Sequence, residues 1–553
     1  MCPLWFQADR GCRSRLASRW WVILLVGSVS LIVGQRGMSD ETGGGGAIRK
    51  QATPRESTID QLLAESWRKA GVKPAPLATD EEFVRRVYLD LVGRIPSVSE
   101  ATAFFQTRES GKRAKLVEYL LEHPDYPQWF ATQWTILLLG RGDPGERVDR
   151  SALVAWLRKQ FAANRPWNEL VHDLIAASGS NRENGAVNFV LAHLEPDAVP
   201  LTSRTTRLFL GRQLQCAQCH DHPSNEWKQS DFWSLNAFFK GIRVEGSRSR
   251  GSSRGNLDAV VLADEPTEDY ARFEKRNGMV GVAFPRFLDG RKLPAAGEVE
   301  RRAELARMIS EPTNDALAQA FVNRMWAHFL GRGLVSPVDD LGPHNPPSHP
   351  ELLEFLAREF QSSGYDVKQL IRLITASRAY QATSERPKNS SPDESPFQFH
   401  YMQLRPMSPE QLFDSLLTAT GAHRAGGSRS DEKRDRWLRQ FLYVFGNDEG
   451  EELTTFQGTI PQALMMMNGE LIREAVSAKP GSFLAETVRQ AEAQPRPAVY
   501  LVNQLYLAAL SRSPTARELA QAGLFLQTDP NSLDVLQDLF WALLNSNEFI
   551  LIH

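Results

Sequence analysis

The chain has 553 residues, of which 42% are hydrophobic and 24% charged, and these proportions are ordinary for a soluble globular protein. Lys and Arg number 64 against 66 Asp and Glu, so no net charge attracts the chain to nucleic acid, and we expect no nucleic-acid partner. At about 150 residues per domain, the length excludes a single core and predicts three or four structural units.

Residues 1–36 have the order of a secretory signal. An uncharged run, 20–34, follows four arginines at positions 10, 13, 15 and 19. The run is shorter than the roughly twenty residues of a membrane-spanning helix, and no clean Ala-x-Ala cleavage site follows it. We therefore expect a signal peptide or an N-terminal membrane anchor, a Gly-rich linker at 37–55, and a periplasmic or extracellular protein that is secreted or anchored.

Apolar residues at helical spacing predict a first helical domain over 56–240. The pattern is clear in Ile59, Leu63 and Trp67, and it continues through later segments. Near the end of this domain, the segment 205–215 is expected to be a helix that leads into Cys216. The aromatic residues of the domain are interpreted as core.

Residues 241–296 are expected to form a loop and a small β insertion, with strands at 258–262 and 279–284. Helical periodicity then returns and predicts a second helical domain over 297–553. Within it, Ser408 is a predicted N-cap and Pro409 the first helical residue. The predicted fold class is mainly α, with two helical domains and a small β-containing insertion between them.

One pattern occurs twice at identical spacing. Tyr88 is followed by Arg94, Pro96 and Glu100, and the same residue types recur as Tyr506, Arg512, Pro514 and Glu518. In each copy an apolar helix ends at a short turn, and Pro with a Ser or Thr cap begins the next helix. The pattern predicts two helix-turn-helix units with a structural role.

The pentapeptide Cys216-Ala-Gln-Cys219-His220 carries the most specific chemistry of the chain. Two thiols at this spacing can form thioethers with the two vinyl groups of a haem, and the adjacent imidazole can bind its iron. Cys2 and Cys12 lie in the signal segment, so these two are the only cysteines of the body. We therefore predict covalent attachment of a c-type haem through Cys216, Cys219 and His220.

Two other occupants of this segment stay open. Cys216, Cys219, His220 and His222 together could bind zinc or non-haem iron, although ligands so close in sequence strain a tetrahedral site. The two sulfurs could instead form a redox or structural disulfide.

A second axial ligand cannot be assigned from sequence, because His193, His328, His344, His349 and several methionines are all candidates. Asp339-Asp340 beside His344 and His349 would suit a second metal site or paired-carboxylate catalysis, but the surrounding prolines favour a rigid connector. The acidic run 448–452 could bind a cation and is more simply a solvated loop.

Long motifs give the chain a family resemblance. The segments 83–96 and 207–223 resemble a domain of unknown function numbered fifteen-forty-nine, and 323–334, 345–353 and 405–412 resemble one numbered fifteen-fifty-three. Residues 541–549 close the match. Planctomycete-type exported proteins join these two domains and often occur with cytochrome c domains. The resemblance implies this two-domain arrangement and an association with cytochromes, but no settled activity.

Three functions are compatible with these features. The first is an extracytoplasmic haem protein in electron transfer or oxidation, with a redox partner such as a cytochrome c. The second is a zinc or iron hydrolase or lyase acting on extracellular polymers. The third is a cell-envelope scaffold. The sequence does not identify a substrate or a catalytic residue.

Overall fold

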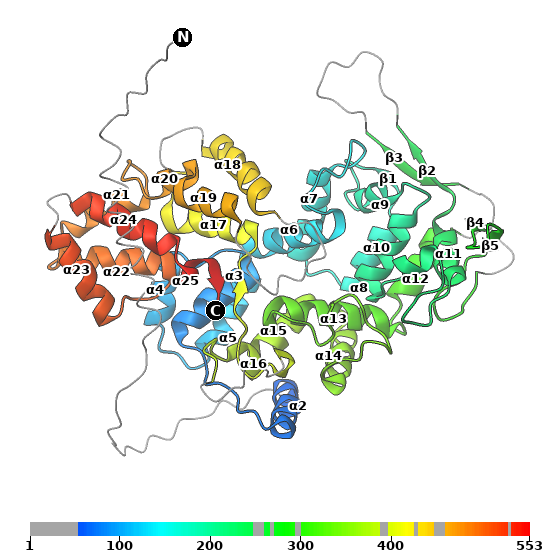
Figure 1. Ribbon diagram of the computed structural model, residues 1–553, viewed down its shortest axis with the longest axis horizontal. Coiled ribbons are helices and arrows are strands. Elements are labelled where there is room, and N and C mark those ends of the chain that lie inside the picture. The colour runs from blue at the N-terminus through cyan, green and yellow to red at the C-terminus, as the bar shows by residue number, and fades with distance from the viewer. Residues whose placement is uncertain are drawn as a thin grey trace, which may run out of the picture.

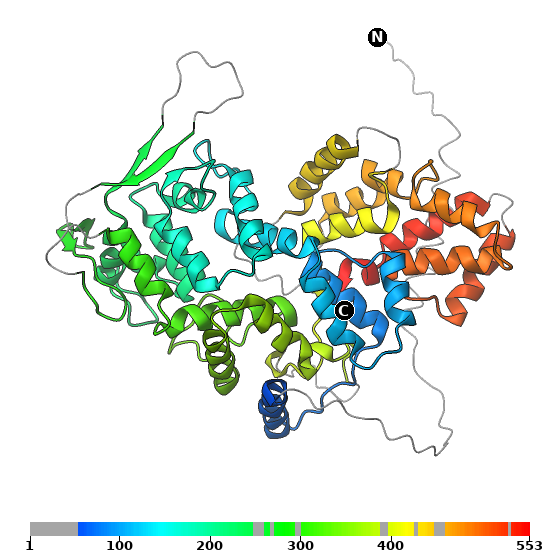
Figure 2. The same cartoon turned by 180° about the vertical axis from the view of Figure 1, so that it is seen from behind.

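The computed structural model describes residues 54–246, 259–265, 270–293, 300–387, 396–424, 430–446, 459–528 and 532–553 (Figure 1). The predicted signal segment 1–36, most of the predicted linker and the acidic run 448–452 lie outside these described residues. Helices dominate the described part, which confirms the mainly α prediction. They gather in two lobes, and Figure 2 shows the same division from behind.

The helices before residue 240 follow one another through short turns. They are α2 (Pro54–Ala70), α3 (Asp80–Val92), α4 (Val98–Gln106), α5 (Lys112–Leu121), α6 (Asp125–Leu139), α7 (Arg150–Ala162), α8 (Trp167–Ala176), α9 (Val187–His193), α10 (Val199–Leu210), η1 (Gln215–Gln218), α11 (Gln229–Asn236) and η2 (Ala237–Phe239). Helix α3 shows why they begin and end where they do. The Thr79 side chain caps its first turn, and Gly93 ends it with a φ of 73° that glycine adopts without steric cost.

The later helices resume after residue 300. They are α12 (Arg301–Ser310), α13 (Asp315–Leu330), α14 (Pro350–Ser362), α15 (Val367–Ala376), α16 (Arg378–Gln381), η3 (Pro396–Gln398), α17 (Pro409–Thr420), α18 (Ser430–Phe445), α19 (Ile460–Asn468), α20 (Glu470–Ala475), α21 (Phe483–Ala491), α22 (Pro497–Leu510), α23 (Ala516–Thr528), α24 (Ser532–Leu544) and α25 (Asn547–Ile550). Ser408 caps α17 in a reciprocal pair with Gln411, and Pro409 is its first residue, as predicted.

The strands of the described residues form small antiparallel sheets. Strands β1 (Gly179–Ser180), β3 (Val261–Asp264) and β2 (Ile242–Glu245) pair in that order, and β4 (Ala271–Glu274) pairs with β5 (Val280–Ala283). The predicted insertion 241–296 therefore contains β2 to β5. Strands β3 and β5 overlap the expected runs, whereas β2 and β4 were not expected. A third pair, β6 (Arg405–Pro406) with β7 (Leu551–Ile552), brings the last residues of the chain beside residue 405.

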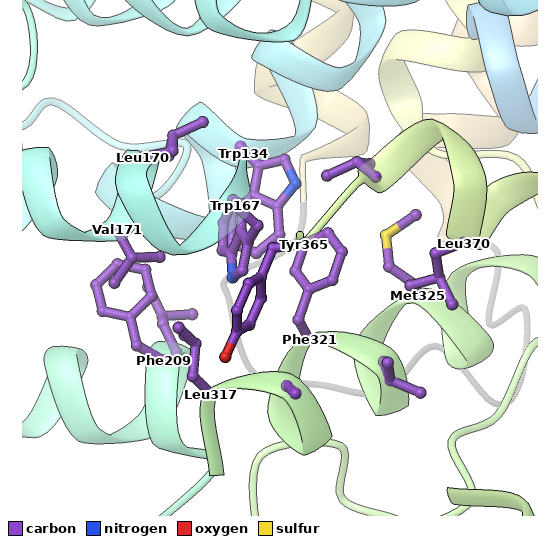
Figure 3. Packing of buried hydrophobic residues seen from close by; sticks show 14 of the residues in the cluster. Trp134, Trp167, Leu170, Val171, Phe209, Leu317, Phe321, Met325, Tyr365 and Leu370 are labelled. Carbon is purple, nitrogen blue, oxygen red and sulfur yellow. The ribbon is translucent and has the colours of Figure 1, made fainter. Parts of the chain in front are cut away.

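The larger hydrophobic core draws buried residues from Ile59 to Met402, so it includes helices on both sides of the β insertion. Figure 3 shows its aromatic centre. The Trp167 ring of α8 lies 4.3 Å from Trp134 of α6 and 4.4 Å from Phe321 of α13, measured between ring centroids. Helices before and after the insertion thus share one packed interior.

The second core runs from Met407 to Ile552 and also contains Leu89 and Ile95. These two residues belong to α3 and the turn after it, so the N-terminal segment contributes to both cores. Side-chain hydrogen bonds strengthen this connection, since Gln411 of α17 donates to the carbonyl of Leu89 at 2.9 Å and Ile95 donates its N–H to Ser415 at 3.2 Å.

The twice-occurring pattern forms two matching helix-turn-helix units, α3–α4 and α22–α23, which confirms the structural prediction. In each unit an arginine pairs with a glutamate through both of its terminal nitrogens: Arg94 with Glu100 at 2.9 and 3.0 Å, and Arg512 with Glu518 at 3.0 and 3.0 Å. Each guanidinium also lies over a tyrosine ring, Tyr88 or Tyr506. The repeated residues therefore build the same turn twice.

A buried ionic cluster joins α3 to later parts of the chain. The Asp90 side chain is fully buried and accepts hydrogen bonds from Arg405 at 3.0 and 3.1 Å and from the Tyr380 hydroxyl at 2.9 Å. Its backbone carbonyl accepts from Trp129 and His328. Segments separated by about three hundred residues meet at this one carboxylate.

Candidate functional site

The cysteine loop begins where α10 stops. The helix predicted over 205–215 ends at Leu210, so that prediction was wrong beyond this residue. Gly211 has a φ of 61°, and a Cβ there would lie 2.5 Å from a methyl carbon of Leu341. A tertiary contact with the 337–345 segment, which requires glycine, therefore breaks the helix before the cysteines.

The 337–345 segment holds the start of the loop in place. Leu341 donates its N–H to the Gly211 carbonyl at 2.8 Å, and Arg212 donates to the Leu341 carbonyl. Asp339, which is 4% exposed, accepts from Gln213 at 2.9 Å and from Arg207. Asp339 was predicted as part of a connector or a metal site, and in the structure it anchors the cysteine loop.

Cys216 lies in the 3-10 helix η1 and Cys219 directly follows its last residue, and both cysteines are free and exposed. Ala217 between them is fully buried, which fixes the turn against the core. The Gln218 carbonyl accepts hydrogen bonds from Trp233 at 3.0 Å and from Gln229 at 3.2 Å. The buried Ala217 and the hydrogen-bonded Gln218 carbonyl thus hold the turn in place, with both thiols at the surface.

The imidazole of His220 has a defined proton position. Its Nδ1 lies 2.7 Å from the Asp221 carbonyl, which can only accept, so the proton is on Nδ1 and the lone pair on Nε2. The Asp221 carboxylate in turn accepts from the backbone N–H of Gln229 at 2.9 Å. A ligand histidine held at its other nitrogen by a carbonyl is common at metal centres.

His222 has the opposite arrangement. Its Nδ1 accepts from the backbone N–H of Ser224 at 3.3 Å, which places the proton of the neutral ring on Nε2. Burial and the nearby His344 lower the pKa of His222 below its ordinary value, and Asp340 opposes this effect. Of the two histidines in the loop, His220 is therefore the one whose Nε2 has a lone pair that could bind a metal ion.

Three of the four histidines considered as a second axial ligand make contacts inside the protein. His193 donates to the Leu138 carbonyl at 2.6 Å, His328 donates to the Asp90 carbonyl at 3.0 Å, and His349 packs on Phe399. Burial lowers the pKa of all three. His344 is different, because it lies beside His222 and its Nε2 is 3.0 Å from the Asp340 carboxylate.

We expect His193 to make the stability of the protein depend on pH. Burial lowers its pKa from 6.5 to about 4. Between these two pH values, His193 is protonated in the unfolded chain and neutral in the folded chain. This stabilisation is complete above pH 6.5 and is lost as the pH falls toward 4, by about 3 kcal/mol. Urea unfolding of His193→Gln should show a flatter decline over this range, and parallel declines in both proteins would contradict the assignment.

The donor set of the loop fits a c-type haem. Both thiols are exposed, as thioether formation with separate vinyl groups requires, and His220 Nε2 carries the lone pair that iron needs. Among the described residues, no three His, Cys, Asp or Glu side chains converge as a metal site. The residues that would hold the haem are Cys216, Cys219 and His220.

Sequence reasoning missed the partners of this site, namely Gln213, Gln229, Trp233 and the 337–345 segment. These partners are ordinary residue types, and most of them lie far from the cysteines in the sequence. The signal that the chain turns there is the Gly211-Arg212 pair after an apolar helix.

Within the described ranges, no helix is long and apolar enough to cross a membrane. Two family models match the chain: Protein of unknown function (DUF1549) over residues 58–244 and Protein of unknown function (DUF1553) over 301–440. No curated protein and no solved structure shows a significant match. The cysteine loop lies in the first matched region and its anchoring segment 337–345 in the second, and the chain joins these two domains of unknown function, as the resemblance implied.

Proposed function

We propose that the protein carries a covalent c-type haem on Cys216, Cys219 and His220 and acts outside the cytoplasm in electron transfer or oxidation. The observation that carries this proposal is the 2.7 Å contact between His220 Nδ1 and the Asp221 carbonyl, which makes Nδ1 the donor and leaves the lone pair of the neutral ring on Nε2. Exposed thiols on the neighbouring turn support it.

The chain's own residues would keep the ligand in place. Gln229 fixes the Asp221 carboxylate, and the clamped Gln218 carbonyl fixes the turn between the two thiols. When bound, a haem supplies one-electron redox chemistry, whose potential depends on burial and on hydrogen bonds to the ligand histidine. A small exported cytochrome c would be a suitable redox partner for a haem attached at the surface.

A zinc or non-haem iron ion is the second candidate, with a hydrolytic or lyase activity on extracellular polymers. The observation that favours it is the Asp340–His344 pair, whose charges act on His222. This pair has an oxygen and a nitrogen donor, which would have to move toward the loop to bind a metal, because no three such side chains converge in the described residues. In this alternative His222 is a ligand, whereas in the haem proposal it is not.

The full chain should be produced in a host with a working cytochrome c maturation system and then denatured and extracted with acidic acetone. We expect the haem absorption to stay with the polypeptide, and to disappear in the double variant Cys216→Ser, Cys219→Ser. His222→Gln is the matched control from the same loop and should keep the covalent haem.

A colourless wild-type protein from this host would overturn the haem proposal. Bound zinc or iron that is lost in His222→Gln would establish the second candidate in its place. Circular dichroism of each variant separates loss of the cofactor from loss of the fold.

A further inference from the structure

A cleft of about 1040 Å³ lies between the two lobes, away from the cysteine loop. One wall comes from the α3–α4 turn, α6 and the start of α7, and the other from α17 and α18, which adjoin α6 in Figure 1. No residue of 211–222 lines it. Its volume reaches the upper limit of the range for small-molecule sites, so it can take a ligand of several linked rings.

Ion pairs hold the walls of the cleft in position. Arg141 binds both oxygens of Glu410 at 3.0 Å and so connects the two lobes directly. Arg434 of α18 binds Asp414 of α17 at 2.9 Å. The Asp414 side chain keeps 40% of its surface exposed although burial raises its pKa, as expected of a group in the wall of a concave site.

Two further arginines in the lining form no ion pair with a carboxylate of the described residues. Arg424 and Arg439 are exposed, and in the described part of the chain neither forms an ion pair or a side-chain hydrogen bond. Their guanidinium groups offer planar donors that match carboxylate or sulfate oxygens. The cleft therefore has a positive excess that the protein itself does not neutralise.

Three threonines line the cleft, and two of them can accept a hydrogen bond from a ligand. The hydroxyls of Thr132, Thr135 and Thr418 each donate to a carbonyl of their own helix, at 2.9, 2.7 and 2.8 Å. Their protons are thus already used. Thr135 is only 2% exposed and is not open to a ligand, and the Thr132 oxygen also accepts from Gln128 at 3.5 Å. The oxygens of Thr132 and Thr418 each keep a free lone pair. Tyr443, whose side chain is 90% exposed, adds an aromatic face to the lining. A ligand that fits this lining has hydroxyl groups that donate and anionic groups that accept.

We propose that this cleft binds an oligosaccharide bearing anionic groups, carboxylate or sulfate. Arg424 and Arg439 bind the anionic groups, Thr132 and Thr418 accept from sugar hydroxyls, and Tyr443 lies against a sugar ring. The site is independent of the proposed haem, so either can fail without the other.

Isothermal titration calorimetry of the full chain tests this with tetragalacturonate, a sulfated galactan tetrasaccharide, neutral maltotetraose and tetraglutamate as probes. We expect one or both anionic sugars to bind, more weakly as salt rises, and maltotetraose not to bind. The carboxylated and sulfated probes show which anionic group the cleft prefers.

Arg424→Gln and Arg439→Gln should each weaken binding about fivefold, which corresponds to a partly exposed ion pair. Arg436→Gln is the matched control. Arg436 belongs to the same helix as Arg439, but it pairs with Glu470 outside the cleft. Equal effects of Arg439→Gln and Arg436→Gln, equal binding of maltotetraose, or no binding of either anionic sugar would overturn the proposal. Tighter binding of tetraglutamate would also overturn it and point to an acidic protein partner.

Discussion

Replacing Asp90 by Asn is expected to lower the free energy of unfolding by about 3–5 kcal/mol. The carboxylate is fully buried and is the acceptor for Arg405 and Tyr380. With a neutral amide in its place, the Arg405 guanidinium, whose side chain is only 14% exposed, keeps its charge without a counter-ion. Urea unfolding at neutral pH measures the loss.

A second variant separates this ionic effect from simple disruption. Removing both charges, with Asp90→Asn and Arg405→Met together, should recover a large part of the lost stability, because no unpaired charge is then left inside. The amide of the Asp90→Asn variant keeps one oxygen that can still accept from Arg405, and the double variant loses this bond as well, so the measured recovery understates the cost of the unpaired charge. If the double variant were less stable than Asp90→Asn by the full cost of a second deletion, the buried-charge explanation would be wrong.

Replacing Trp167 by Ala is also expected to cost about 3–5 kcal/mol, because it leaves a cavity in the larger core. The side chain is 1% exposed and packs between Trp134 and Phe321 (Figure 3). In the sequence, Trp134 precedes the β insertion and Phe321 follows it. The cavity would therefore weaken the contact between the two matched regions.

Trp167→Phe provides the control for this substitution. Phenylalanine fills much of the ring volume and removes the indole N–H, which is buried without a hydrogen-bond partner. We expect its cost to stay below about 1.5 kcal/mol. A loss as large as that of Trp167→Ala would show that ring size at this position is not what stabilises the core.

Local sequence signals predicted the helical fold and the repeated turn. Ser408, Pro409 and Gln411 lie close together in the chain, so their capping arrangement could be predicted without knowledge of the rest. The same holds for Arg94 and Glu100, six residues apart, and for their counterparts. Within the candidate site, the cysteine pair with His220 was recognisable for the same reason.

Contacts between distant residues account for what the sequence did not predict. Helix α10 ends early because Gly211 approaches Leu341, and nothing in the 205–215 pattern indicates that neighbour. The cleft depends on Arg141 and Glu410, which are 269 residues apart. Asp339 has the residue type of a metal ligand, and only its contacts with Gln213 and Arg207 reveal an anchoring role.

The position of α3 has a consequence for the order in which the chain can fold. Arg85, fully buried, donates to the carbonyls of Ala509 and Phe549, which lie 424 and 464 residues later. An early helix with a buried guanidinium has no carbonyls to satisfy it until those late segments have been synthesised. The packing of α3 is therefore completed only by residues near 550, which favours completion of the fold after the whole chain has emerged.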